Sequence, residues 1–496
     1  MFKVSVAMNQ KGRTGFCVII CFCLLLLLGG CAVLNTRDDL SQIIDGHTFI
    51  DDMGQKVEVN ASYKKIITLY SAHTENLFTL GAEDKVIGVD TSSTYPPPAA
   101  FLPRYDYKGD PEPVIAAQPD LVIIRPFIAR NYPDFVHALK NAGLKVIALY
   151  PATSVDFEKY VRILAMLTGT EEQAQVELDQ LKQRIAEIQE KVSHSGEKPT
   201  VFFEATEKNY RTVTVDSNPA RAIELAGGMN IADDVVPMEK GSTIAEYGIE
   251  KIMQNAENID VYMTQRGAMN SGGSIISINQ RQGFKAIKAV KEGRILELNE
   301  KIISSPNFRY YKGVQEIARM LYPDIMDDYS VYDSGQQLTR EAYAAITVMF
   351  SHVPVFIPSS SHYYETKYYN HTYGLFEDVA WTDPSFDFIE TAVMHSFIKG
   401  YKREDGTEYF EKEGYVTRED LAFTLNIMGD FTTGGQHKSI ADLNECKNNK
   451  EIVQKIVDSG IMTVDGNQRF NPQKTVSAHE AIMVLESLKK DSKQDH

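Results

Sequence analysis

Short runs of apolar residues alternate with amphipathic segments over much of the chain. The first block has four such runs, separated by stretches of helical character near 74–80 and 134–142. The second block repeats the pattern, with helices expected near 220–225 and 313–321. Apolar runs that alternate with helices are typical of parallel sheets covered on both faces. The runs are 64–69, 85–89, 121–124 and 145–149 in the first block, and 200–203, 259–263 and 294–298 in the second.

One long amphipathic segment separates the two blocks. Residues 171–192 contain neither proline nor glycine, and apolar residues recur there at spacings of three and four, which places them on one stripe of a helix. An ordinary core helix would show the same stripe. Its position between two blocks favours a rigid connection between two lobes, and two lobes on one helix imply a cleft. The stripe consists of Leu178, Leu181, Ile185, Ile188 and Val192.

The N-terminus has the pattern of an export signal. Lys3, Lys11 and Arg13 precede the apolar run 16–28, which is too short to cross a bilayer comfortably. Two glycines and then Cys31 follow the run, and this junction resembles the lipobox of bacterial lipoproteins. We therefore expect lipid on Cys31 and a protein held at the outer face of the cytoplasmic membrane. An uncleaved signal anchor would hold the domains at the same surface.

The composition limits the partners and the chemistry. The 496 residues include 51 Lys and Arg against 67 Asp and Glu, and the net charge of −16 argues against nucleic acid as a partner. If Cys31 carries lipid and the signal is removed, Cys446 is the one cysteine left, so no internal disulfide is expected. No GxSxG, HExxH or P-loop pattern is present, and we expect no enzyme, no cofactor and no resident metal. His362 and His371 lie among tyrosines, which fits a solvated connector better than a metal or haem site.

Arginine and tyrosine follow several of the predicted strands. Ligands bind α/β proteins at the C-terminal ends of the strands, so these residues are expected to line the cleft. Guanidinium groups suit the carboxylate, catecholate or propionate groups of an anionic ligand, and tyrosines offer flat apolar faces with a polar tip. Salt bridges for Arg266 and Arg309, and a helix cap for His73, are the competing explanations. The candidate ligand-binding residues are Tyr70, His73, Tyr95, Arg125, Tyr210, Arg211, Arg266, Arg309 and Tyr310.

Several short motifs occur in a fixed order across residues 45–324. They are the stretch 66–90, then Tyr95-Pro96-Pro97, Gly109–Glu112, Gln118–Val122, Leu225–Asn230 and Gly313–Pro323. This ordered set resembles the cobalamin and iron-siderophore class of periplasmic binding proteins. The resemblance implies two lobes joined by one helix, little hinge closure, a ligand in a shallow cleft, and an ABC permease with its ATPase as partners.

The same resemblance implies two sites of contact with the permease. In that family a carboxylate on each lobe docks onto permease arginines, since charge pairing fixes register and speeds encounter. Glu112 matches the first carboxylate, but Met229 stands where the second is expected. Glu224, Asp233 and Asp234 are the remaining candidates, each of which could equally be a plain surface charge.

The C-terminal part repeats a pattern. Segments 376–429 and 440–489 each have an acidic start, a helix, a turn with glycine, a phenylalanine and a second helix. With the Thr-Arg-Glu motifs around Arg340 and Arg418, they resemble S-layer homology repeats. The resemblance implies that both arginines bind pyruvylated cell-wall polymer, because a guanidinium suits a carboxylate. The third copy at 476–480 lacks the arginine, so a folded spacer is the alternative.

The predicted fold class is α/β, with two Rossmann-like lobes joined by a long rigid helix (the class III binding-protein fold), followed by mainly α-helical S-layer homology-like repeats. We expect a solute-binding lipoprotein that delivers an iron complex, a siderophore or haem, to an ABC importer. A cobalamin or other corrinoid, with fewer arginines and more aromatics around it, is the alternative ligand. A cell-wall structural protein without a transport role is the alternative class. The expected divisions are signal peptide 1–30, tether 31–44, N-terminal lobe 45–155, inter-lobe helix 156–195, C-terminal lobe 196–324, partial repeat and Tyr/His-rich connector 325–375, and repeats 376–490.

Overall fold

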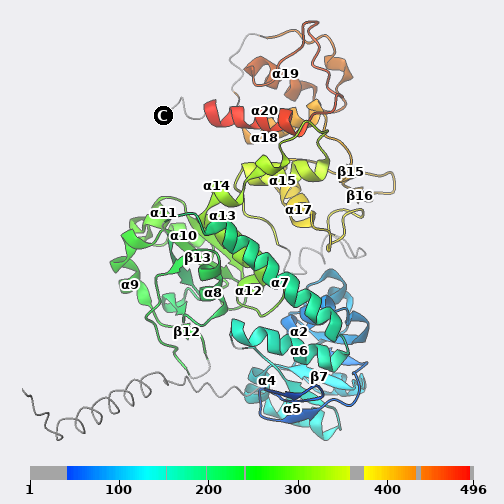
Figure 1. The fold of residues 1–496 in the computed structure, drawn as a ribbon, viewed down its shortest axis with the longest axis vertical. Coiled ribbons are helices and arrows are strands. Elements are labelled where there is room, and N and C mark those ends of the chain that lie inside the picture. The colour runs from blue at the N-terminus through cyan, green and yellow to red at the C-terminus, as the bar shows by residue number, and fades with distance from the viewer. Residues whose placement is uncertain are drawn as a thin grey trace, which may run out of the picture.

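Two separate parallel sheets form two lobes, and a smaller helical module follows them (Figure 1). The computed structural model describes residues 42–491, apart from residues 152, 197, 240–241, 358–373, 430 and 432–436. The expected signal peptide, the lipidation site Cys31 and the histidines His362 and His371 lie outside the described residues. The predicted fold class is confirmed.

The N-terminal lobe is built on a five-stranded parallel sheet in the order β6-β5-β4-β7-β8. Ile66 and Ile67 are adjacent in β4 but belong to different apolar clusters, because successive side chains of a strand point to opposite faces. Helices α2 and α6 supply the cluster on one face, and α4 and α5 the cluster on the other. A three-stranded antiparallel meander, β1-β2-β3, adds Phe49 and Val57 to the first cluster. The strands are β1 (Gln42–Asp45), β2 (Thr48–Ile50), β3 (Lys56–Glu58), β4 (Ile66–Thr68), β5 (Val86–Asp90), β6 (Arg104–Tyr105), β7 (Leu121–Ile124) and β8 (Val146–Ala148), and the helices are α2 (Ser71–Thr79), α3 (Glu112–Ala116), α4 (Pro126–Asn131), α5 (Pro133–Asn141) and α6 (Phe157–Thr168).

The C-terminal lobe has a four-stranded parallel sheet in the order β11-β9-β13-β14, again with an apolar cluster on each face. Phe203 belongs to the cluster under α8 and α13, whereas Phe202 and Tyr262 belong to the opposite one. A short antiparallel pair, β10-β12, lies beside this sheet. The strands are β9 (Thr200–Glu204), β10 (Thr212–Val213), β11 (Met229–Asn230), β12 (Ile244–Ala245), β13 (Val261–Arg266) and β14 (Ile295–Asn299), and the helices are α8 (Asn218–Leu225), α9 (Gly248–Gln254), α10 (Ile275–Gln280), α11 (Lys288–Lys291), α12 (Glu300–Ile303), α13 (Tyr310–Leu321) and α14 (Pro323–Met326).

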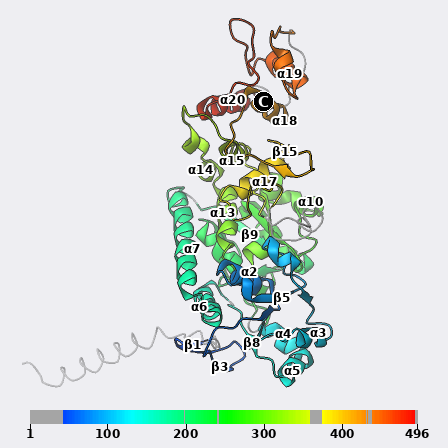
Figure 2. The same ribbon diagram turned by 90° about the vertical axis from the view of Figure 1, so that its right-hand side faces the viewer.

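Helix α7 (Glu171–Val192) runs along one side of both lobes (Figure 2). Leu178 near its start is part of the N-terminal lobe's core, whereas Ile188 and Val192 near its end are part of the C-terminal lobe's core. One apolar stripe therefore serves two cores, which makes the helix a strut between them. The range 156–195 holds two helices rather than one, because Gly169 in the left-handed region ends α6 before α7 begins.

A second connection between the lobes is the segment 304–309, which links α12 to α13 and which we call the crossing segment. The carbonyl of Pro306 accepts a hydrogen bond from Asn76 Nδ2 at 2.9 Å. Phe308 belongs to the core of the N-terminal lobe, and Arg309 forms a buried ion pair with Glu75 at 2.5 Å. The lobes are thus joined by interlocking side chains as well as by α7, so a hinge motion would have to break buried contacts.

The C-terminal module lies above the two lobes in Figure 1, and in the described part of residues 329–491 three similar units are joined in a ring by backbone hydrogen bonds. Leu338, Val416 and Val476 bond to one another in a closed circle, with three backbone N–H···O bonds of 3.0 Å. A helix follows each of these residues, capped by the hydroxyl of Thr339, Thr417 or Ser477. The helices of the module are α15 (Arg340–Phe350), α17 (Phe386–Met394), α18 (Arg418–Met428), α19 (Lys450–Ser459) and α20 (Ala478–Asp491), with the short turn η7 (Tyr329–Tyr332) and the hairpin β15 (Tyr401–Lys402) and β16 (Glu408–Tyr409).

The three units differ in what packs against the capped helix. Helix α17 packs on α15, and α19 packs on α18. At α20 the turn η7 takes the place of a second helix. The Tyr329 hydroxyl donates a hydrogen bond to Glu486 of α20, and the Tyr329 ring contacts Phe350 of α15. The polypeptide that leaves the C-terminal lobe therefore completes the core of the module, and the two modules are continuous structures.

His73 predicts how the N-terminal lobe responds to acid. It is completely buried, with Nδ1 2.7 Å from the Tyr160 hydroxyl and Nε2 3.3 Å from the carbonyl oxygen of Ile124. Burial lowers the pKa of His73 from 6.5 to about 3. The folded state therefore favours the neutral form of His73. The stabilisation that this preference gives is complete above pH 6.5 and is lost as the pH falls toward 3.

We expect the wild-type protein to lose about 1 kcal/mol more of its free energy of unfolding than His73→Gln between pH 6 and pH 5. Urea denaturation at each pH measures the difference. His137→Gln is the control because His137 is exposed and its replacement should leave the slope unchanged. Parallel curves for wild type and His73→Gln would show that His73 is not held neutral.

Candidate functional site

Three predicted strands of the N-terminal lobe end in residues that meet. Tyr70 follows β4, Arg125 follows β7 and Tyr150 follows β8, and these strands are neighbours in the sheet. The guanidinium carbon of Arg125 lies 4.5 Å from the ring centre of Tyr70 and 4.9 Å from that of Tyr150. The cation is therefore held between two aromatic rings, which attract it through their electron-rich faces.

Further aromatic side chains extend this surface. Phe127 lies 5.7 Å from the Arg125 guanidinium and contacts Tyr132, which in turn packs edge-on against Tyr107. Phe127 is 40% exposed, although it is a large apolar side chain. We call the whole surface the aromatic face. It consists of Tyr70, Tyr107, Arg125, Phe127, Tyr132 and Tyr150.

The charge of Arg125 has no acid partner within the described part of the chain. Its Nε is buried and makes no hydrogen bond there. Burial raises the pKa of the Tyr70 phenol, so that ring stays neutral. A buried donor without an acceptor is costly unless something else supplies the bond, and a ligand oxygen would do so.

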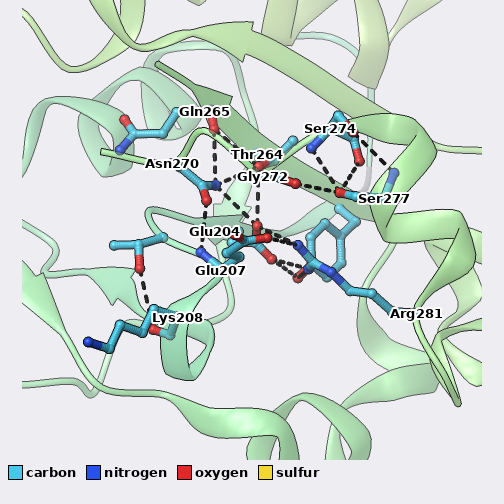
Figure 3. A network of polar contacts seen from close by, with 12 residues as sticks. Glu204, Glu207, Lys208, Thr264, Gln265, Asn270, Gly272, Ser274, Ser277 and Arg281 are labelled. Carbon is cyan, nitrogen blue, oxygen red and sulfur yellow. Dashed lines mark hydrogen bonds and ion pairs between the residues drawn. The ribbon is translucent and has the colours of Figure 1, made fainter. Parts of the chain in front are cut away.

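The strand ends of the C-terminal lobe carry a polar network instead (Figure 3). Glu204, the last residue of β9, has no exposed surface and accepts hydrogen bonds from Tyr262 at 2.6 Å and from Asn270 at 3.1 Å. Arg281 pairs with both oxygens of the same carboxylate, and the longer of the two bonds measures 3.1 Å. A buried carboxylate with this many donors is satisfied, so the network is a structural support rather than an open ligand site.

This network holds the loop 267–274 between β13 and α10. Asn270 accepts from the backbone N–H of Glu207 at 2.8 Å and donates to the carbonyl of Gln265 at 3.0 Å. A Cβ on Gly272 would lie 2.2 Å from the Glu207 carboxylate, so a larger residue there would displace the end of that side chain. The loop and the start of α10 leave Met269 and Ile276 exposed, Ile276 by 70%. These exposed apolar side chains make the loop a candidate contact surface.

The two strand-end surfaces come together at α12 and the crossing segment. The phenol of Tyr70 in the N-terminal lobe lies near Ser305; burial raises the Tyr70 pKa, and the side chain of Ser305 lowers it to a smaller extent. Ser304 donates to Gln265, and Glu300 accepts from the backbone N–H of Met269 at 3.0 Å. The aromatic face and the loop of the C-terminal lobe therefore border the same stretch of chain, 300–305.

Four of the predicted ligand residues lie in the interior. His73 is in the core of the N-terminal lobe, and Tyr310 donates to the carbonyl of Asn218 inside the C-terminal lobe. Arg309 is paired with Glu75, and Tyr95 packs against the Arg309 guanidinium at 3.6 Å. Each of these four residues is at most 8% exposed and is occupied by partners from its own chain, so their ligand role stays a prediction that this arrangement does not favour.

The remaining predicted residues lie at the surface of one lobe or the other. The structure brings Tyr70 and Arg125 together, as expected of neighbouring strand ends. Tyr210 packs on Phe284 in the C-terminal lobe. Arg266 is exposed and pairs with Glu297 at 2.9 Å, and Arg211 has a buried Nε without a partner in the described residues.

The pairing of the arginines decides the electrostatic character of the candidate site. Arg266, Arg281 and Arg309 are each neutralised by a glutamate. Arg125 has no acid partner in the described residues, and three aromatic rings lie around its guanidinium. The surface therefore suits a large flat ligand with few negative charges better than a polyanion.

The arginines predicted to bind cell-wall polymer have partners inside the C-terminal module. Arg340 is 1% exposed; its Nε donates to the carbonyl of Phe410 at 2.8 Å, and its guanidinium lies over the Tyr401 ring. Arg418 makes the equivalent bond to Phe470 and also pairs with Glu480 at 2.7 Å. Ala478 stands at the third position. Both arginines thus tie one unit of the ring to the next.

The residues of the candidate site and of its supporting network that the sequence did not predict fall into two groups. Tyr150 and Phe127 could have been found, because Tyr150 follows a predicted strand just as Tyr70 and Arg125 do. The network around Glu204 could not, since its partners Asn270 and Arg281 lie 66 and 77 residues away. Glu112 is exposed at the start of α3, as a docking residue would have to be, but the structure does not test that role.

Within residues 42–491, excluding the gaps given above, no three His, Cys, Asp or Glu side chains are placed to hold a metal ion. In the same part of the chain no helix is both long and apolar enough to cross a membrane.

Comparison with known proteins identifies two domain types. Residues 66–302 match the family model "Periplasmic binding protein", and residues 439–477 match the "S-layer homology domain". Residues 66–302 are therefore similar to periplasmic binding proteins, and residues 439–477 are similar to S-layer homology domains. The two similarities indicate an extracytoplasmic protein associated with the cell surface.

Three related proteins illustrate the match. An uncharacterized ABC transporter substrate-binding lipoprotein of Bacillus subtilis, YvrC, is 27% identical over 282 residues, which are 56% of this chain and 86% of that protein. The vitamin B12-binding protein of Vibrio parahaemolyticus is 26% identical over 261 residues, 52% of this chain and 89% of that protein. The crystal structure of a possible iron-binding protein of Staphylococcus epidermidis has 26% identity and a TM-score of 0.47, covering 53% of this chain and all of that one.

The network in Figure 3 yields a test of how the loop 267–274 is supported. Glu204→Gln removes the charge that balances Arg281, and we expect a loss of about 3 kcal/mol in the free energy of unfolding, because breaking one side of a buried ion pair leaves an uncompensated charge. Glu224→Gln is the matched control, since Glu224 pairs with Arg221 at the surface, where such pairs contribute less than about 1 kcal/mol. Equal effects of the two substitutions in urea denaturation would contradict the structural role of Glu204.

Proposed function

We propose that this chain is the substrate-binding component of an ABC importer and that its ligand is a corrinoid. The ligand would lie against the aromatic face, with the exposed apolar side chains of the loop 267–274 and the start of α10 opposite. No chemical conversion is involved: the protein captures the ligand and releases it to the permease.

The observation that supports this ligand is the composition of the aromatic face. A corrin ring is large and flat, and its periphery consists mostly of neutral amides. Stacked tyrosine rings bury the flat part, and Arg125 supplies one strong donor for a ring amide or for the phosphate of the nucleotide tail. The relationship to a vitamin B12-binding protein over 89% of that protein's length agrees with this choice.

An iron complex, siderophore or haem, is the second candidate. The sequence favoured it because arginines follow so many strands, but Arg266 and Arg309 are engaged by glutamates. What still supports haem is the pairing of a flat aromatic surface with the guanidinium of Arg125, which has no acid partner in the described residues and suits a propionate. A purely structural cell-wall protein would not need this surface.

The partners follow from the same proposal. The permease and its ATPase would receive the ligand, with Glu112 as the contact on the N-terminal lobe. On the C-terminal lobe Met229 is exposed where a carboxylate was expected, and Asp233 and Asp234 are exposed nearby in the sequence. Lipid on Cys31 would hold the protein at the membrane, and the C-terminal module would reach the cell-wall polymer.

Titration of the full chain with cyanocobalamin, haemin and a ferric siderophore tests the ligand. We expect saturable binding of cyanocobalamin in isothermal calorimetry and at least about tenfold weaker binding by Tyr70→Ala, because a stacked aromatic contact contributes about 0.5–1.5 kcal/mol beyond the area it buries. Tyr415→Ala, an exposed tyrosine of the C-terminal module, should bind like the wild type. Preference for haemin or the siderophore would replace the corrinoid, and no binding of any of the three would end the proposal.

Wall attachment needs a test that separates binding from folding. Arg340→Ala leaves the carbonyls of Phe410 and Lys399 without their donor, and we expect the module to lose about 3 kcal/mol of stability. Thermal unfolding and co-sedimentation of the full chain with purified cell walls are measured together, with Arg403→Ala as the exposed control in the same module. If Arg340→Ala abolished co-sedimentation at unchanged stability, Arg340 would be a polymer contact rather than a structural tie.

A further inference from the structure

The single tryptophan of the chain lies where three parts of the protein meet. Trp381 belongs to the C-terminal module, and its ring packs edge-on against Tyr95 of the N-terminal lobe, with ring centres 5.8 Å apart. The Tyr95 ring also stacks with the Arg309 guanidinium at the start of α13, at 3.6 Å. Arg309 in turn is bonded through Nε and Nη2 to Glu75, at 2.5 and 2.9 Å. One continuous stack thus joins the module to both lobes.

A second contact lies one turn further along α13. Lys312 forms an ion pair with Asp387 at the start of α17, and the two side chains are only 20% and 15% exposed. An ion pair so largely removed from water is stabilising only when its geometry is maintained, and separating its partners would leave two poorly solvated charges. Trp381 and Asp387 are close in sequence, so one short stretch of the module contacts both lobes.

A third contact comes from the segment 352–357, which follows α15. The backbone N–H of Val355 donates to Glu316 at 2.8 Å, and Arg319 donates to the carbonyl of Val353 at 3.2 Å. Ile357 belongs to the apolar core of the C-terminal lobe and is 8% exposed. If the module moved away, this segment would have to leave the lobe's core.

We propose that residues 381–387 of the C-terminal module dock on Tyr95 and Lys312, and that the module acts as a brace that holds the two lobes at a fixed separation. The surface on the lobes is formed by the loop 93–97 and the start of α13, and its partner is this chain's own module. Whatever surface the module attaches to, the lobes are carried in a set orientation rather than on a loose tether. The brace does not depend on the identity of the ligand.

Hydrogen–deuterium exchange of the full chain tests the brace. Trp381→Ala should raise the exchange rate of the backbone around 93–101 and 310–314 by roughly two- to tenfold. Loss of an aromatic contact lowers the free energy of local opening by an amount that corresponds to this change in rate. Both regions are more than 60 residues from Trp381 in sequence. The first lies in the N-terminal lobe and the second in the C-terminal lobe, so neither belongs to the module that carries Trp381. Arg403→Ala is the control, because it removes an exposed ion pair with Glu377 within the same module and should leave both regions unchanged. Faster exchange confined to 375–395 would overturn the proposal.

A second measurement covers the case in which Trp381→Ala unfolds the module. Lys312→Met removes the ion pair from the lobe side, and acrylamide quenching then reports the exposure of Trp381. We expect quenching to rise toward that of the unfolded chain. Arg266→Met, an exposed position on the same lobe, should leave it at the wild-type value. Unchanged quenching in Lys312→Met would show that the docked position of Trp381 does not depend on the lobes.

Discussion

The buried ion pair between Arg309 and Glu75 is the constraint on which the architecture depends. Two charges withdrawn from water are stable only at close range and with their remaining hydrogen-bonding groups engaged, and here the Arg309 guanidinium is also covered by the Tyr95 ring. Because the two residues come from different lobes, the pair fixes one point of contact between them. Phe308, inserted into the core of the N-terminal lobe, fixes a second point beside it. Helix α7 provides a third connection, because residues of its apolar stripe are part of the cores of both lobes.

A binding site built on such a frame is formed before the ligand arrives. The aromatic face is anchored at three neighbouring strand ends, and the loop 267–274 is held by the network around Glu204. Little conformational freedom remains to be lost on binding, which favours affinity, and release then needs an external agent such as a permease. The C-terminal module adds to the same frame, since Trp381 and Asp387 touch the lobes beside the Arg309 pair.

The sequence predicts what periodicity and strand order determine, and it fails where contacts join distant residues. The bounds of α7 and the apolar strands follow from local patterns, and the rule that strand ends carry ligand residues places Tyr70 and Arg125 correctly together. The same rule also assigns Arg309 to the ligand. The sequence gives no local sign that Arg309 pairs instead with Glu75, which lies 234 residues earlier. The contact between Trp381 and Tyr95 has no local signal in the sequence either.

The spacing of the two lobes is the quantity that tests this account most directly. Spin labels introduced as unnatural amino acids at the exposed positions Asn141 and Glu292 report one lobe each, and double electron–electron resonance gives the distribution of distances between them. A frame locked by Arg309, Phe308 and α7 predicts one narrow distribution that is the same with and without ligand. A broad or two-peaked distribution, or a shift of several ångströms on ligand addition, would show that the lobes move as hinged bodies and would contradict the account.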